Sequence, residues 1–329
     1  MLISIVIPVY NREGIVRRTL ACVAAQTHRP LQVVLVDNDS TDHSLAVLQQ
    51  FKADHEAPGF EVVVAQETER HTAAAARQRG FELAKGDYVM FFDSDDLMTP
   101  DLAAAYAQVV EQRPDADIVL ARSVLQHTDG TQQSLPFASS DFTANQILHS
   151  LMSSQRYIVR RTFFAASEGW NVDVRQWDDW ELGLRLLLDK PCVATLPGAS
   201  RVTLVASGEE SITGNDFASR AGRWEHAIDL NLANVTQAQL PAREARRYTR
   251  LLEYVRMVLA AQYQHEGRDD LAKPLRQQAV EAIAATYPSK NGSHPSMLFR
   301  LVVEPMLKAL YNHIAAGRRG AAHIAKRLL

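Results

Sequence analysis

The 329-residue sequence has little cysteine and lacks the common phosphate-binding loops. Its two cysteines, Cys22 and Cys192, belong to no Cys-x-x-Cys pair and no Cys/His cluster. The sequence therefore predicts neither a zinc site nor a disulfide framework, and it fits a reducing compartment. No GxGxxG and no GxxxxGK[ST] motif occurs. Their absence argues against Rossmann dehydrogenases and P-loop enzymes, which cradle phosphates in those loops.

Long apolar runs and an excess of charge are also missing. No run approaches the roughly 20 apolar residues that span a bilayer. The apolar stretch 2–9 follows no basic residue and contains Pro8, so it predicts a buried strand rather than a signal peptide, and the expected location is the cytoplasm. Lys and Arg total 35 and Asp and Glu total 38, a net charge of −3. This balance argues against a nucleic-acid partner.

Short β-branched runs alternate with amphipathic helical patterns in the first 121 residues. The expected strands are 3–9, 32–36, 61–65, 88–92 and 117–121. The expected helices are 12–26, 42–51, 73–84 and 100–112. Strands that are apolar throughout and alternate with helices predict an α/β fold with a mostly parallel sheet flanked by helices.

The pattern becomes less regular after residue 121. Asp129-Gly130 predicts a hairpin turn. Further helices are expected over 143–153 and 177–188, and further strands over 192–196 and 201–206. From about residue 215 the sequence predicts helices only, over 223–234, 243–265 and 271–287. The expected organisation is an α/β domain over 1–213, with halves 1–121 and 122–213, followed by a helical region over 214–329.

Polar segments follow three of the expected strands, as Tyr10-Asn11, Asp37-Asn38-Asp39 and Asp93-Ser94-Asp95. Ligands of such sheets bind outside the carboxyl ends of the strands. Carboxylates that meet there repel one another unless a cation or hydrogen-bond donors lie among them. Asp93 and Asp95 suit Mg²⁺ or Mn²⁺, whose coordination phosphate oxygens would complete. The alternative for this cluster is that Asp96 caps a following helix over 97–106.

A second acidic pair, Asp178-Asp179, lies at the start of an expected helix between Trp177 and Trp180. Indole rings can stack on sugar rings, and an aspartate among them could serve as a general base. The alternative is that the tryptophans pack in the core and the acids stabilise the start of the helix. Arg77 could neutralise a phosphate, or it could be a solvated surface charge.

Together these segments resemble the inverting GT-A glycosyltransferases of the family 2 type. The matching segments, in the family's order, are SIVIPVYN at 4–11, VDNDSTD at 36–42, ERHTAAAARQRG at 69–80, KGDYVMFFDSDD at 85–96 and WDDWELGLRL at 177–186. The resemblance spans residues 3 to about 213. It implies a GT-A fold, like that of nucleotide-diphospho-sugar transferases.

The resemblance also implies a role for each matching position. The residues expected to bind the nucleotide or the donor are Pro8, Tyr10, Asn11, Asp37, Arg77, Asp93 and Ser94. Asp95 would bind Mg²⁺ or Mn²⁺ on the donor diphosphate, and Asp179 would be the general base. At its reference pKa of about 3.9, Asp179 is expected to be ionised at neutral pH. Trp177, Asp178 and Trp180 are candidates for the acceptor side.

The implied reaction moves a sugar from a nucleotide-sugar donor to a hydroxyl of a saccharide or lipid-linked acceptor, as in cell-surface polysaccharide synthesis. One direct displacement inverts the anomeric centre, in a transfer counterpart of inverting hydrolysis. Several positions depart from the family's pattern: Asn38, Arg70, Thr72, Gln78 and Asp178. Arg70 suggests the hypothesis that the donor carries an acidic sugar.

Other functions fit the sequence less well. A haloacid-dehalogenase-like phosphatase needs its Asp-x-Asp motif on the first strand, whereas here the motif follows the fourth. Sugar-phosphate nucleotidyltransferases need a glycine-rich arginine loop after the first strand, which is missing. The alternative that stays open is a degenerate glycosyltransferase that binds nucleotide or polysaccharide as a non-catalytic assembly factor.

The C-terminal tail 298–329 carries six basic residues and one acid, a net charge of +5, so the rest of the chain carries −8. Apolar residues recur in it at helical spacing. Such a basic amphipathic tail could make peripheral contact with a membrane at its inner face. It could equally pack on the main domain with a solvated basic side. The sequence indicates no particular oligomeric state.

Overall fold

The computed structural model describes residues 1–206, 217–289 and 295–329, and these form two compact units. The first contains the described residues up to 206 except 141–150, and the second contains 141–150 and the remaining described residues. The sequence-based boundary placed 141–150 in the first domain, and the structure corrects this assignment. The segment belongs to the second unit because Asp141 pairs there with Arg247 at 2.9 Å and with Lys326 at 3.0 Å.

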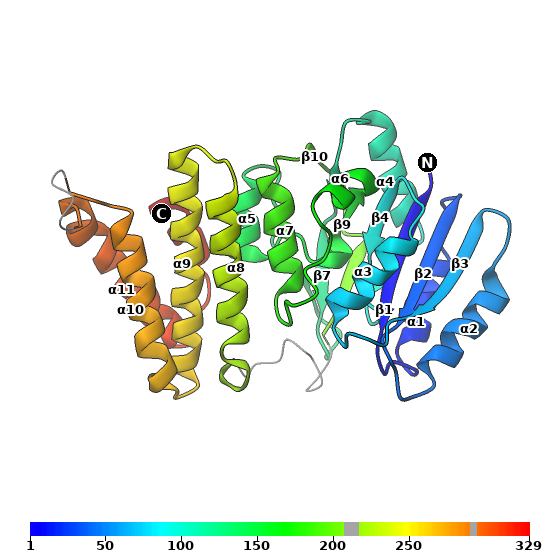
Figure 1. Ribbon diagram of the computed structural model, residues 1–329, viewed down its shortest axis with the longest axis horizontal. Coiled ribbons are helices and arrows are strands. Elements are labelled where there is room, and N and C mark those ends of the chain that lie inside the picture. Colours follow the sequence, from blue (N-terminus) through cyan, green and yellow to red (C-terminus); the bar gives the residue numbers. More distant parts are fainter. Residues whose placement is uncertain (207–216, 290–294) are drawn as a thin grey trace. The chain divides into compact units, whose positions relative to one another are not determined.

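A seven-stranded sheet forms the centre of the first unit, in the order β10-β6-β9-β4-β1-β2-β3 (Figure 1). Its strands are β1 (Ile3–Val9), β2 (Leu31–Asp37), β3 (Phe60–Gln66), β4 (Tyr88–Phe91), β6 (Ile118–Leu120), β9 (Tyr157–Arg160) and β10 (Val193–Thr195). All neighbours pair in parallel except β9, which is antiparallel to both β4 and β6. The mostly parallel sheet is confirmed, and β9 is the strand that the sequence pattern does not predict.

Helices cover both faces of this sheet. They are α1 (Val16–Ala24), α2 (Ser44–His55), α3 (Ala73–Leu83), α4 (Leu102–Gln112), α6 (Arg161–Ala166) and α7 (Asp178–Leu188). The odd-numbered residues of β1 share one core with α1, α2 and α4. Its even-numbered Val6 faces α3, which lies across the other face (Figure 1). Because β1 and β2 are buried on both faces, their sequences are apolar without alternation.

The helix expected over 12–26 begins only at Val16. Asn11 adopts a positive φ of 49°, and its side-chain oxygen accepts a hydrogen bond from the Thr41 amide at 2.8 Å. The backbone N–H of Asn11 donates to Ser40 Oγ at 3.1 Å. These contacts hold the segment after β1 as a loop, so the helix starts one turn later than its apolar pattern.

A smaller sheet in the order β5-β11-β7-β8 completes the first unit. Its strands are β5 (Leu97–Met98), β7 (Ser123–Gln126), β8 (Gln132–Ser134) and β11 (Val202–Val205). β7 and β8 pair antiparallel around Asp129-Gly130, which confirms the predicted hairpin. Gly130 has a φ of 82°, a conformation that glycine adopts without steric cost.

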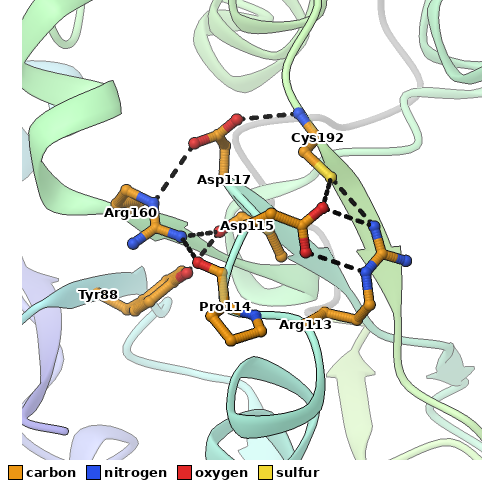
Figure 2. A network of polar contacts seen from close by, with 8 residues as sticks. Tyr88, Arg113, Pro114, Asp115, Asp117, Arg160 and Cys192 are labelled. Atoms are coloured by element: carbon orange, nitrogen blue, oxygen red, sulfur yellow. Dashed lines mark hydrogen bonds and ion pairs between the residues drawn. The ribbon is translucent and has the colours of Figure 1, made fainter.

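Polar contacts join β4, β6, β9 and β10 of the larger sheet at one edge, where the Tyr88 hydroxyl of β4 donates to the carbonyl of Ala116 (Figure 2). Arg160 donates to the carbonyls of Pro114 and Ala116 at 2.6 and 2.7 Å and pairs with Asp117 at 3.4 Å. Asp117 in turn accepts from the backbone N–H of Cys192 at 2.9 Å. The Cys192 thiol donates to Asp115, which Arg113 also holds. Cys192 therefore takes part in a structural network.

The second unit is helical, as expected, and α9 (Ala242–His265) lies at its centre. Around it pack α5 (Phe142–His149), α8 (Arg223–Gln237), α10 (Asp269–Ala285), α11 (Glu304–Ala315) and α12 (Ala322–Leu328). A π-helical turn, η3 (Phe299–Val303), precedes α11. Arg256 of α9 is buried and pairs with Glu253 at 2.8 Å and with Asp229 of α8 at 2.6 Å. Among the described residues, no helix is long and apolar enough to cross a membrane.

Gly86 permits a close approach of backbone segments beside β1. Its N–H donates to Ser4 Oγ at 2.9 Å, and the Ser4 hydroxyl donates to Gln32 Oε1 at 2.6 Å. A Cβ at Gly86 would lie 2.6 Å from the Ser4 amide nitrogen and 2.7 Å from the Tyr88 carbonyl oxygen. Both atoms belong to backbone that is fixed in the sheet, so they cannot move aside cheaply.

We therefore expect Gly86→Ala to lower the free energy of unfolding by about 1–3 kcal/mol, the usual cost of overpacking. Gly14→Ala is the matched control, because nothing lies within 4 Å of its added Cβ, and its effect should stay within about 0.5 kcal/mol. Urea denaturation followed by tryptophan fluorescence measures both. Equal stability of the two variants would contradict the close approach.

Candidate active site

The carboxyl ends of β1, β2 and β4 lie side by side. β1 pairs with β2 up to Val9 and Asp37, and with β4 up to Val6 and Phe91. The acid-rich segment Asp93-Ser94-Asp95 follows β4 after Phe92. The structure therefore brings the three polar segments to one edge of the sheet, where ligands of parallel sheets bind.

Asp37 closes β2 with a buried carboxylate that is 1% exposed. Its Oδ2 accepts from the Ser40 amide at 3.3 Å and from Gln66 Nε2 at 3.4 Å. Its Oδ1 is buried and has no hydrogen-bond partner among the described residues. A buried acceptor without a donor is costly, so this oxygen is suited to accept from a ligand N–H. Of the neighbours expected beside it, Pro8 is buried in β1 and Tyr10 is 52% exposed.

Arg77 of α3 joins the two acidic motifs. Its side chain is only 7% exposed, and its terminal nitrogens donate to Asp93 at 2.6 Å and to Asp178 at 2.7 Å. The guanidinium also lies over the ring of Trp170, 4.8 Å from the centroid. Burial by itself would lower the pKa of Arg77, but the two carboxylates outweigh it and raise the pKa, so the charge is permanent.

Arg77 was expected either to neutralise a phosphate or to be a solvated surface charge. Its burial and its two ion pairs exclude the solvated surface charge. Both terminal nitrogens already bind carboxylates, so the residue positions Asp93 and Asp178 relative to each other. Its Nε is buried without a partner among the described residues. Trp170 was not singled out from the sequence, since nothing in its local pattern indicates a contact with residue 77.

A second side chain, Gln155, holds Asp93 from the other side. Gln155 lies in the short turn η1 (Ser154–Arg156) and donates through Nε2 to Asp93 and to Asp96. Ser154 Oγ lies 3.5 Å from Asp93 Oδ1. Sequence reasoning missed both residues. No signal in the sequence could have found them, because the segment 153–156 carries no motif.

Asp96 is not the cap of a helix, which corrects the alternative considered for this cluster. Residues 97–98 form β5, and α4 begins only at Leu102. Asp96 is 4% exposed and accepts from the Val205 amide at 2.8 Å and from Gln155 at 2.6 Å. Burial, with the nearby charges of Asp93 and Asp95, raises the pKa of Asp96 to about 8.

Ser94 contributes through its backbone. Its side chain is buried, and its carbonyl oxygen accepts from the hydroxyl of Thr19 in α1 at 2.9 Å. The carbonyl of Asp96 lies at the same distance from that hydroxyl. The acid-rich segment after β4 is therefore anchored on α1.

Of the acids at this edge, Asp95 is the one best placed to bind a divalent cation. Both oxygens of Asp93 are engaged by Arg77 and Gln155, whereas Asp95 makes no ion pair with a described residue. Burial and the charge of Asp93 raise the pKa of Asp95, and a bound cation would offset both effects. No described group of three or more His, Cys, Asp or Glu side chains could hold a metal by itself. One carboxylate completed by substrate phosphates is the arrangement that Mg²⁺ often takes.

The second acidic motif opens α7, which begins at Asp178 after Trp177 with a φ of 56°. Trp180 is 4% exposed and lies in the core, whereas Trp177 is half-buried and contacts Trp180 with ring centroids 5.3 Å apart. The expectation that the tryptophans pack in the core therefore holds for Trp180. Trp177 is the indole of the pair that keeps accessible surface.

Asp179 differs from the expectation in its ionisation. Burial, followed by the neighbouring charge of Asp178, raises the pKa of Asp179 to about 7, although Arg77 opposes the change. Burial also raises the pKa of Asp178. The expected pKa near 3.9 is therefore wrong for Asp179, because burial and the charge of Asp178 disfavour its ionised form.

Comparison with known proteins identifies the family of this site. The family model "Glycosyl transferase family 2" matches residues 4–166. The chain belongs to glycosyl transferase family 2. An uncharacterized glycosyltransferase of Haemophilus influenzae is 25% identical over 190 residues, which cover 56% of this chain and 62% of that protein. The poly(ribitol-phosphate) beta-glucosyltransferase of Bacillus spizizenii is 40% identical over 98 residues, 29% of this chain and 15% of that protein.

This family 2 chain thus spans less than two thirds of the length of these curated relatives. Solved structures support the GT-A fold. TarS 1-349 of S. aureus, in complex with UDP-GlcNAc, matches with a TM-score of 0.69 at 16% identity, covering 99% of this chain and 91% of that one. The mannosyltransferase PcManGT of Pyrobaculum calidifontis, in complex with GDP-Man and Mn²⁺, matches with a TM-score of 0.56 at 19% identity, covering 99% and 86%.

The contacts of Arg77 in this family 2 site predict a large effect on stability. Arg77→Met leaves two part-buried carboxylates without their counter-charge, so we expect a loss of about 3–5 kcal/mol in the free energy of unfolding. Arg79→Met is the control on the same helix. Arg79 is 44% exposed and its one ion pair among the described residues is with Glu82, so its loss should cost at most about 0.5 kcal/mol.

Urea denaturation of both variants at neutral pH provides the comparison. Should Arg77→Met prove as stable as Arg79→Met, the two acidic motifs do not depend on Arg77.

Proposed function

We propose that this chain is a metal-dependent inverting glycosyltransferase. It moves a sugar from a nucleoside-diphosphate donor to a hydroxyl of a saccharide or lipid-linked acceptor, and its role is in cell-surface polysaccharide synthesis. The observation that carries the proposal is the pair of Arg77 contacts, 2.6 Å to Asp93 and 2.7 Å to Asp178. They join the acids after β4 and the start of α7 into one site. The proposed reaction requires this, because the donor and the general base must lie side by side.

Recognition of the donor begins at Asp37. Its unpartnered Oδ1 would accept from an N–H of the nucleotide base, and the exposed ring of Tyr10 would cover that base. Asp93, held by Arg77 and Gln155, would face the ribose. The related structures with UDP-GlcNAc and GDP-Man support a nucleotide-sugar donor for this chain.

The leaving diphosphate gains negative charge in the transition state. Asp95, together with the donor phosphates, would hold Mg²⁺ or Mn²⁺, which would supply Lewis-acid stabilisation of that charge. Asp95 suits this role because no described side chain competes for its carboxylate. The Mn²⁺ in the complex of the Pyrobaculum mannosyltransferase supports the use of a divalent cation.

Asp179 would accept the proton of the acceptor hydroxyl while that oxygen attacks the anomeric carbon. The carbon–oxygen bond to the diphosphate breaks in the same displacement, which inverts the anomeric centre. With a pKa of about 7, Asp179 is a stronger base than an ordinary aspartate and is about half deprotonated at neutral pH. Trp177, beside it at the start of α7, offers an indole surface for a sugar ring of the acceptor.

The first test is release of nucleoside diphosphate from a panel of UDP- and GDP-sugars with Mn²⁺ and candidate saccharide acceptors. We expect Asp179→Asn to lower the turnover number by about 10²- to 10⁴-fold with little change in nucleotide binding, because only proton transfer is lost. Asp95→Ala should abolish the Mn²⁺-dependent release of nucleoside diphosphate. The control, Asp54→Asn on the exposed side of α2, should behave as the unchanged chain.

Two outcomes would contradict this proposal. Normal turnover by Asp179→Asn removes Asp179 from the role of base. Binding of nucleoside diphosphate with Mn²⁺, detected by thermal shift, without release from any donor would instead favour the non-catalytic assembly factor.

The second test is the pH dependence of kcat/KM. A base must be deprotonated, so a pKa of about 7 at Asp179 makes the rate fall about tenfold per pH unit below pH 7 and level off above it. Asp178→Asn removes the negative charge that helps to raise this pKa, so the acidic limb should move to lower pH. A limb near pH 4 in the unchanged chain, or one that Asp178→Asn leaves in place, would refute the assignment.

A further inference from the structure

Exposed apolar side chains are concentrated in one short segment of the second unit. Among the described residues, eight large apolar side chains are exposed, and five of them lie within residues 297–306. They are Met297 at 76%, Leu298 at 56%, Leu301 at 67%, Val302 at 44% and Met306 at 38% exposed. Single exposed apolar residues are ordinary, but a contiguous group marks an interaction surface.

The helical geometry explains why both sides of this segment are apolar. Phe299, Val303 and Leu307 recur every four residues and are buried, at 2%, 2% and 1% exposed. Leu298, Val302 and Met306 recur with the same spacing one position earlier and are exposed. The π-helical turn η3 followed by α11 therefore packs one apolar row inward and leaves a second row bare. We call residues 297–308 the exposed stripe.

Cations accompany the exposed stripe without acidic partners. Arg300 and Lys308 lie within it, and both are exposed and form no ion pair with a described carboxylate. Glu304 is the single acid between residues 297 and 329. The same holds for the exposed Arg318, Arg319 and Arg327 nearby in the sequence, whereas Lys326 pairs with Asp141.

The tail thus divides into two parts with different environments. α12 packs on α5 and α9 of the helical unit, where Ala325 is fully buried and Leu329 is 7% exposed. This corrects the expectation that 298–329 behaves as one segment that either meets a membrane or packs on the main domain. Among the described residues of the tail, only the exposed stripe combines a group of exposed apolar side chains with cations that form no ion pair.

We propose that the exposed stripe docks on the surface of an anionic lipid bilayer. An interfacial helix lies in the plane of the headgroups, buries its apolar face to about 5–10 Å and places cations beside lipid phosphates. Leu298, Leu301 and Val302 provide that face. Arg300 and Lys308 have long aliphatic stems, so they can follow the apolar surface while their charged ends reach the headgroups.

A second copy of this chain fits the stripe less well. A twofold contact presents the same surface twice, so Arg300 and Lys308 would meet copies of themselves with Glu304 as the one available acid. An anionic bilayer supplies the missing negative charge and the apolar phase together. Docking there goes beyond the proposed transfer reaction, and it holds or fails independently of it.

Sedimentation of the full chain with vesicles tests the proposal without any assay of activity. We expect binding to phosphatidylglycerol–phosphatidylcholine vesicles and none to phosphatidylcholine alone. Arg300→Gln with Lys308→Gln should weaken binding about 30-fold, because each basic residue near an anionic surface strengthens binding roughly fivefold and the two factors multiply. Leu301→Ser with Val302→Ser should weaken it at least about tenfold.

Arg243→Gln with Arg246→Gln is the matched control. Both residues are exposed on α9, so the pair removes the same charge from the same unit outside the stripe, and binding should be unchanged. All three double variants alter exposed positions, and their thermal unfolding should match that of the unchanged chain.

Three results would overturn the proposal. One is failure of the unchanged chain to sediment with phosphatidylglycerol vesicles. Another is an equal loss of binding in the control, which would show attraction by net charge alone. The third is a dimer in light scattering that Leu301→Ser with Val302→Ser converts to a monomer, which would assign the stripe to a second copy.

Discussion

The site depends on one buried cation. Taking the charge of Arg77 out of water is affordable only when carboxylates replace the solvent, and the chain supplies Asp93 and Asp178 from positions 16 and 101 residues away. Once these pairs form, the segment after β4 and the start of α7 have fixed positions relative to each other. Trp170 covers the guanidinium and excludes water from it. The geometry around the sheet edge follows from satisfying this charge.

The same arrangement leaves an excess of negative charge. Arg77 pairs with Asp93 and Asp178, and Asp95, Asp96 and Asp179 add three more carboxylates close by. Burial, followed by repulsion from neighbouring carboxylates, raises the pKa values of Asp95, Asp96 and Asp179. The consequence is a site that gains from binding a cation beside Asp95 and that holds a carboxylate able to exchange a proton near neutral pH at Asp179. The affinity of Asp95 for a cation and the basicity of Asp179 therefore have the same cause, which is burial beside other carboxylates.

Sequence patterns predict the parts of this structure that local physics determines. β1 and β2 are apolar throughout because they are buried on both faces, and α7 has a clear amphipathic period, so these elements and the acids at their ends could be predicted. β9 could not, because only Tyr157, Ile158 and Val159 precede two arginines and the strand pairs antiparallel between β4 and β6. Gln155 and the pKa of Asp179 depend on neighbours that are distant in sequence or brought close by folding.

The C-terminal tail shows why composition alone could not separate two outcomes. Its segments are alike in being basic and amphipathic, yet Lys326 pairs with Asp141 while Arg300 and Lys308 pair with no carboxylate of the described residues. The difference arises from Asp141, which has a positive φ of 51° at the start of α5 and binds Arg247 and Lys326 together. That acid holds α12 against the helical unit. Where no such acid is present, the cations and the bare apolar row of 297–308 stay available to a partner that carries negative charge.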